Sequence, residues 1–160
     1  MKLDVLAFGA HPDDVELGAG GILAVHAAKG KKVGIIDLTR GEMGTRGTPE
    51  LRDLEAEEAA RILGCVIREN LAFPDGRIPT NHSAQIKVAE VIRKYQPEVV
   101  LMNAPTDRHP DHGRASQLVE EACFLSGLHK LNKKRFMMFR NVAACIGIVL
   151  GSLLALTSCA

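Results

Sequence analysis

The chain has 160 residues, of which 46% are hydrophobic and 24% are charged, a composition typical of a soluble globular protein with one domain. Its 20 basic and 19 acidic side chains leave a formal net charge of +1, so composition supports neither a nucleic-acid-binding protein nor one that binds acidic membranes. The four cysteines include no Cys-x-x-Cys pair, and the first residues, "MKLDVLAFGA", do not have the pattern of an export signal. We therefore expect a cytoplasmic protein with reduced thiols and no cysteine zinc site.

Strand and helix patterns alternate along the chain. Apolar runs rich in β-branched residues predict strands at residues 3–8, 33–39, 66–72 and 98–103. Helical spacing of apolar residues predicts helices at residues 22–30, 49–63, 83–95 and 112–126. Thr48 followed by Pro49 is a typical helix start, and Gly64 a typical helix end. This alternation predicts an α/β, Rossmann-like domain of three layers with a mainly parallel sheet.

The last residues depart from this pattern. From Asn132, a basic cluster precedes residues 142–156, which are mostly apolar and uncharged, and "LTSC" resembles a bacterial lipobox. The apolar stretch is shorter than the ~20 residues of a membrane span, and an export signal could not act at this end of a chain. We expect a domain over residues 1–131, incomplete at its C-terminus, and an unrelated segment over residues 132–160. A C-terminal core helix and a membrane tail are the alternatives.

Two His-Pro-Asp clusters each follow a predicted strand. The stretch "AFGAHPDDVELGAGG" (residues 7–21) ends the first strand, and "TDRHPDHGR" (residues 106–114) follows the strand that ends near residue 103. Ligands gather at the carboxyl ends of parallel strands, so the clusters should meet there. Histidine and aspartate can hold a catalytic zinc with one position open, and a carboxylate that is not a ligand can take a proton from water. The alternative is a pair of solvated turns held by aspartate and proline.

At this point the sequence resembles a known family. "GAHPDDVELGAGG" together with "HPDHGRA" is similar to the LmbE-like, or PIG-L, zinc-dependent deacetylases over roughly residues 1–130. The stretch "DLTRGEMGTRGT" (residues 37–48) is most similar to the members of bacillithiol biosynthesis. The resemblance implies a hydrolase that removes the acetyl group from an N-acetylglucosamine conjugate, which would be N-acetylglucosaminyl-malate. The alternatives are another N-acetylated sugar as substrate, or a truncated member that binds metal but is inactive.

The resemblance also implies roles for residues of the two clusters. The implied zinc ligands are His11, Asp14 and His112. Asp13 would be the general base that takes a proton from water. His109 would stabilise the developing negative charge, with Asp111 orienting its ring.

The loop at residues 40–48 adds candidates for substrate binding. Arg46 lies between glycines, and its guanidinium suits a carboxylate, such as that of malate, or sugar hydroxyls. Glu42 would bind sugar hydroxyls or orient a loop, and its alternative is a solvated loop acid. We expect zinc, with iron or cobalt as alternatives, a small amino-sugar substrate and no nucleic acid; a homo-oligomer is compatible with the family. Association with a membrane is expected only if the apolar tail is an anchor.

Overall fold

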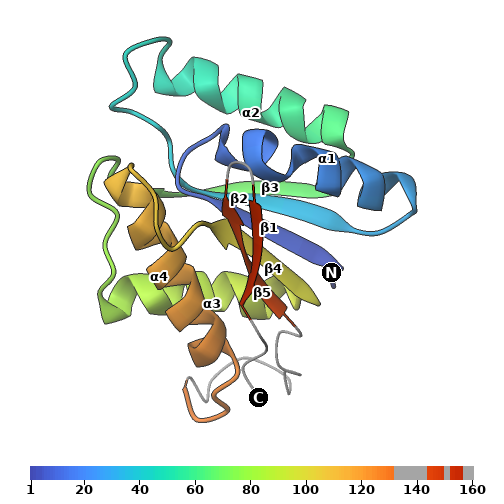
Figure 1. The fold of residues 1–160 in the computed structure, drawn as a ribbon, viewed down its shortest axis with the longest axis vertical. Helices are drawn as coiled ribbons and strands as arrows, with labels where there is room; N and C mark the ends of the chain where they lie inside the picture. The colour runs from blue at the N-terminus through green and yellow to red at the C-terminus, as the bar shows by residue number, and fades with distance from the viewer. Residues whose placement is uncertain (132–143, 150–151, 157–160) are drawn as a thin grey trace.

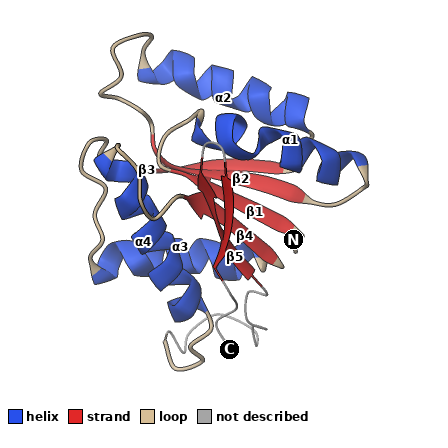
Figure 2. Ribbon diagram, in the orientation of Figure 1, coloured by secondary structure: helices blue, strands red, loops and turns tan. Residues whose placement is uncertain are grey.

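The structure is a computed structural model that describes residues 1–131, 144–149 and 152–156. In this part of the chain, helices lie on either face of a central sheet, as Figure 1 shows. Helices α1 (Asp14–Ala28) and α2 (Pro49–Leu63) cover one face, and helices α3 (His82–Tyr95) and α4 (Pro110–Ser126) cover the other (Figure 2). The predicted three-layer α/β architecture is confirmed.

The described strands form one sheet in the order β3-β2-β1-β4-β5-β6. Their bounds are Val5–Gly9 (β1), Val33–Thr39 (β2), Ile67–Phe73 (β3), Val99–Asn103 (β4), Ala144–Val149 (β5) and Ser152–Leu156 (β6). Neighbours from β3 to β5 are parallel, and β6 runs antiparallel to β5. The chain passes from β1 to β2 on one side, whereas β4 lies on the other side of β1. Because β1 and β4 are parallel neighbours, the loops that follow them meet at one edge of the sheet.

Strand β1 is buried on both faces. Leu6 and Phe8 belong to the core under α3 and α4, and Val5 and Ala7 belong to the core under α1. A strand covered by helices on both faces is apolar along its length, which is why residues 5–8, after Asp4, are continuously apolar rather than alternating. This central strand therefore holds the loop that follows it in a fixed place.

Helix α2 has the predicted bounds, whereas α1, α3 and α4 begin before the predicted residues, α4 at Pro110 rather than at residue 112. Helix α2 begins as predicted, with Thr48 Oγ1 accepting a hydrogen bond from Leu51 N at 3.2 Å. Helix α3 begins at His82 rather than at residue 83, because the Asn81 side chain is its N-cap. Helix α1 begins at Asp14, well before the predicted residue 22, since the small residues of "LGAGG" give no clear apolar period.

The described parts of the C-terminal segment are strands. Strand β5 pairs with β4 in parallel, with Val99 opposite Ala144, and β6 pairs back onto β5. A C-terminal core helix is therefore wrong for residues 144–149 and 152–156, while residues 132–143, 150–151 and 157–160 lie outside the described part. Among the described residues, no helix is long and apolar enough to cross a membrane. The division of the chain at residue 131 stays a prediction.

Candidate metal centre

Asp14 lies between two imidazole rings at the carboxyl edge of the sheet. Its Oδ2 is 3.5 Å from His11 Nδ1, and its Oδ1 is 3.2 Å from His112 Nε2. In a tetrahedral zinc site with bonds of about 2.0–2.1 Å, neighbouring ligand atoms are about 3.3 Å apart. Each histidine therefore lies about one ligand spacing from Asp14, and the three side chains have the donor types that the family resemblance implies for zinc.

The Asp14 carboxylate is placed by the chain as well as by its partners. It is the first residue of α1, where the helix dipole favours a negative charge, and its Oδ2 accepts a hydrogen bond from His11 N at 3.0 Å. Burial opposes its ionisation, but hydrogen bonds from His11 and His112 outweigh burial and hold its pKa well below the usual range. The hydrogen bond to Asp14, with its charge, raises the pKa of His112 to about 9. The Asp14 carboxylate is therefore ionised at neutral pH.

A third histidine faces the same space. The ring centroid of His109 is 4.8 Å from that of His11 and 4.8 Å from that of His112, and a nitrogen of each ring lies within 4.8 Å of the others. His109 is the N-cap of α4, and its Nδ1 accepts a hydrogen bond from Asp111 N at 3.3 Å. His109 is therefore close enough to act on a bound substrate or to be a further ligand.

Asp13 lies beside the metal ligands and lines an open cavity of about 350 Å³. Its backbone has a φ of 130°, a conformation that L-residues rarely adopt, and it directly precedes α1. Partial burial, together with the charge of Asp14, raises its pKa. A carboxylate with a raised pKa beside the ligands is suited to accept a proton. The other residues lining the cavity are His11, Asp14, Gly41, Met43, Gly44, Arg52, Asp75, Gly76 and His109.

The Asp111 carboxylate is fully buried and holds the loop after β3. Its Oδ2 accepts a hydrogen bond from Gly76 N at 2.7 Å, its Oδ1 accepts one from Ile78 N at 3.3 Å, and Oδ2 lies 3.6 Å from His11 Nε2. Contact with His109 comes from the backbone N–H of Asp111. We expected the Asp111 carboxylate to orient His109. In the described contacts the carboxylate instead accepts hydrogen bonds from the loop after β3.

The candidates in the loop at residues 40–48 differ from each other. Glu42 Oε1 accepts a hydrogen bond from Asp75 N at 2.9 Å, which is the loop-orienting role that we considered for it. Arg46 is exposed, and its side chain forms no hydrogen bond or ion pair with the described residues. Arg52, from the first turn of α2, reaches the cavity instead and donates from Nη2 to Arg46 O at 3.1 Å. The structure brings Glu42 near the site but does not bring the Arg46 guanidinium there.

Sequence reasoning missed three polar residues around the ligands. Asp75 Oδ1 lies 3.0 Å from His11 Nε2, and Asp107 Oδ2 lies 3.2 Å from His112 Nδ1. Asn103 Nδ2 donates to Asp14 Oδ2 at 3.1 Å, and Asn103 Oδ1 accepts from Ala10 N at 2.9 Å. Asn103 ends β4 and Asp107 lies inside "TDRHPDH", so position after a strand was a signal for both of them. Asp75 has only the "PDG" turn as a signal.

Comparison with known proteins places these residues in a family. Residues 6–123 match the family described as "PIG-L: GlcNAc-PI de-N-acetylase". The chain belongs to the PIG-L family. This range includes both His-Pro-Asp clusters and the residues that surround the candidate metal centre.

Several relatives in sequence are named as deacetylases, and one that is 31% identical is named "4-oxalmesaconate hydratase", of Pseudomonas putida. "Uncharacterized deacetylase YaiS" of Escherichia coli is 39% identical over 125 residues, which are 74% of this chain and 67% of the relative. "Diacetylchitobiose deacetylase" of Thermococcus kodakarensis is 36% identical and covers 81% of this chain and 52% of its own length. Among solved structures, the conserved protein TT1542 from Thermus thermophilus is 46% identical with a TM-score of 0.85, covering 91% of this chain and 66% of that one. The chain spans about half to two thirds of the length of these relatives.

Proposed function

We propose that the protein is a zinc-dependent N-deacetylase that releases acetate from an N-acetylglucosamine conjugate. The observation that carries the proposal is the convergence of His11, Asp14 and His112 beside a carboxylate, Asp13, that faces an open cavity. Relatives named as deacetylases support this reaction class. The His and Asp donor set favours zinc over calcium or magnesium, which prefer oxygen ligands alone.

The surrounding side chains have separate tasks in this reaction. Zinc, when bound, would polarise the acetyl carbonyl and acidify the attacking water. Asp13 would take the proton of that water, and its raised pKa favours proton transfer near neutral pH. Because His109 Nδ1 accepts from Asp111 N, the proton of the neutral ring is on Nε2. His109 can therefore donate a hydrogen bond to the oxyanion, and Asp13 or His109 would return a proton to the leaving amine.

For the substrate we propose N-acetylglucosaminyl-malate, in a cytoplasmic bacillithiol pathway. The resemblance of residues 37–48 to that branch of the family supports this choice. The malate carboxylates need a cation, and Arg46 and Arg52 are the candidates from the loop and from α2. Arg52 already lines the cavity, whereas Arg46 would have to turn towards a bound substrate.

The test measures bound zinc and acetate release in the same preparations. The purified protein is assayed with N-acetylglucosaminyl-malate and with N,N′-diacetylchitobiose, and zinc is counted by atomic spectroscopy. We expect one zinc per chain and faster release from the malate conjugate. Asp13→Asn should keep its zinc and lose at least about 10²-fold in kcat, while Asp53→Asn, which changes a partly exposed ion pair with Arg40, should behave like the wild type.

Several outcomes would contradict parts of the proposal. Full activity in Asp13→Asn would remove Asp13 as the general base. A faster reaction with diacetylchitobiose would overturn the malate conjugate as the proposed substrate, but the proposed deacetylase activity would stand. Zinc-loaded wild-type protein without activity on either sugar would favour a metal-binding member without deacetylase activity. Comparing Arg46→Gln with Arg52→Gln shows which guanidinium raises KM when it is lost.

A further inference from the structure

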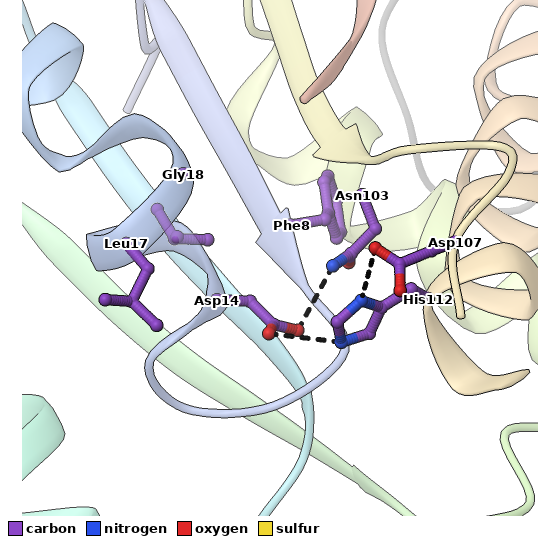
Figure 3. A pocket seen from close by; sticks show the side chains of 8 residues that line it. Phe8, Asp14, Leu17, Gly18, Asn103, Asp107 and His112 are labelled. Carbon is purple, nitrogen blue, oxygen red and sulfur yellow. Dashed lines mark hydrogen bonds and ion pairs between the residues drawn. The ribbon is translucent and has the colours of Figure 1, made fainter. Parts of the chain in front are cut away.

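The His112 ring is held between two carboxylates, one on each nitrogen. Figure 3 shows Asp14 on one side of the ring and Asp107 on the other. His112 Nε2 is 3.2 Å from Asp14 Oδ1, and His112 Nδ1 is 3.2 Å from Asp107 Oδ2. A neutral ring that donates its Nδ1 proton to Asp107 has a lone pair on Nε2, the nitrogen that would face a bound zinc ion.

Asp107 also fixes the start of α4. Its second oxygen, Oδ1, accepts a hydrogen bond from the backbone N–H of His109 at 2.8 Å. The two oxygens of one side chain therefore hold His109 through its backbone and His112 through its ring. Asp107 lies at an exposed position, although only 21% of its side chain is exposed.

His11 has the same arrangement with the nitrogens exchanged. Its Nδ1 faces Asp14 at 3.5 Å, and its Nε2 is 3.0 Å from Asp75 Oδ1. Each candidate metal histidine thus points one nitrogen at Asp14 and the other at a separate carboxylate. Asp14 itself is held by Asn103 (Figure 3). This repeated pattern matches the way in which metal-binding histidines are oriented by partners behind them.

We propose that Asp107 is a positioning residue that selects the metal-binding tautomer of His112. The inference rests on the proposed zinc site and adds to it a residue that does not touch the metal. Asp107 faces Nδ1, on the far side of the ring from Asp14, so it acts through His112 rather than as a ligand. Its hydrogen bond keeps the proton on Nδ1 and turns Nε2 towards the ion.

An asparagine at position 107 tests the contact with the His112 ring separately from the hydrogen bond to the His109 backbone. In Asp107→Asn, the amide oxygen can still accept from His109 N, so the loop keeps its hydrogen bond. The amide NH2 group would then face His112 Nδ1, which would have to accept. That exchange moves the ring proton to Nε2, where it blocks the metal. In Asp107→Ala, both hydrogen bonds are lost.

The experiment measures the zinc dissociation constant by competition with a chromophoric chelator. We expect Asp107→Asn to bind zinc about 10- to 100-fold more weakly than the wild type, the usual effect of removing an orienting partner. Glu98→Gln is the matched control, because it removes one negative charge from a surface pair with Lys2 at the other end of β4. Nitrogen-15 spectra of the zinc-loaded wild type should show the His112 proton on Nδ1, and this signal should weaken in Asp107→Asn.

The outcomes separate this inference from the proposed function. Wild-type protein with no zinc affinity overturns the zinc site, and the inference with it. Wild-type affinity in Asp107→Asn, measured on folded protein, overturns the inference alone. If zinc binding is lost only in Asp107→Ala, Asp107 acts through the loop and the tautomer argument is wrong. A zinc-loaded wild type with the His112 proton on Nε2 contradicts it as well.

Discussion

The metal-free protein should lose stability as the pH rises from 6.5 to 8.5, and His112 should cause most of the loss. The pKa of His112 is raised to about 9 by the hydrogen bond and charge of Asp14, with a further contribution from Asp107. In the unfolded chain the pKa returns to the ordinary value of about 6.5. Because the folded pKa is the higher one, the stabilisation is complete below pH 6.5 and disappears as the pH passes through about 9.

The size of the effect follows from this difference in pKa. At about 1.4 kcal/mol per pKa unit, protonated His112 contributes about 3 kcal/mol to the free energy of unfolding. About 2 kcal/mol of this should be lost between pH 6.5 and 8.5. The pKa of His11 is also raised, since its contacts with Asp14 outweigh burial, and it acts in the same direction. Burial raises the pKa of Cys65 to about 11, so this thiol contributes only at higher pH.

Urea denaturation of chelator-treated protein at pH 6.5 and pH 8.5 measures this loss. The same titrations on His112→Asn should show a much smaller difference between the two pH values, and His82→Asn, at an exposed position, should behave like the wild type. Zinc should stabilise the protein more at pH 8.5 than at pH 6.5, because fewer protons then compete with the ion for His112. An unchanged free energy of unfolding across this range, or the same loss in His112→Asn, would refute the reasoning.

Three further changes test other parts of the structure. His109→Gln should keep zinc and lower kcat by about 10²-fold, whereas loss of zinc in this variant would make His109 a ligand. Arg93→Ala should lower the free energy of unfolding by about 3 kcal/mol in urea titrations, because its buried guanidinium donates to carbonyls at the end of α4. Asp37→Asn should cost about 3 kcal/mol by the same assay, since it removes the charge of the carboxylate that accepts two hydrogen bonds from buried Arg68 and leaves Glu16 as the remaining carboxylate partner.

The predictable parts of this fold are those with local causes. Strand β2 and helix α2 were predicted because a continuous apolar run, a Thr-Pro start and a terminal glycine are all readable in short windows. The start of α1 was not, because its first turns consist largely of small and polar residues. Its position matters for the site, since it makes Asp14 the first helical residue rather than a loop residue.

Contacts between distant parts of the chain could not be predicted in the same way. The pairing of His11 with Asp75 joins the loop after β1 to the loop after β3. Asp111 was expected to orient His109, but its carboxylate is taken by backbone N–H groups of the β3 loop. Arg52 reaches the cavity because α2 starts beside the cavity. The sequence pattern of a helix does not show that one of its arginines faces such a cavity. Each of these depends on which loops the sheet order brings together.

The sheet order explains why a sparse pattern in the sequence can specify a metal centre. Parallel neighbours β1 and β4 place their carboxyl ends side by side, so His11 and His112 need no long loops to approach each other. The N-terminus of α1 then supplies a carboxylate whose charge the helix dipole favours. Topology brings the ligands together, while their orientation depends on the hydrogen bonds behind them. Substitutions at Asp107 and Asn103 should therefore weaken zinc binding without changing the fold.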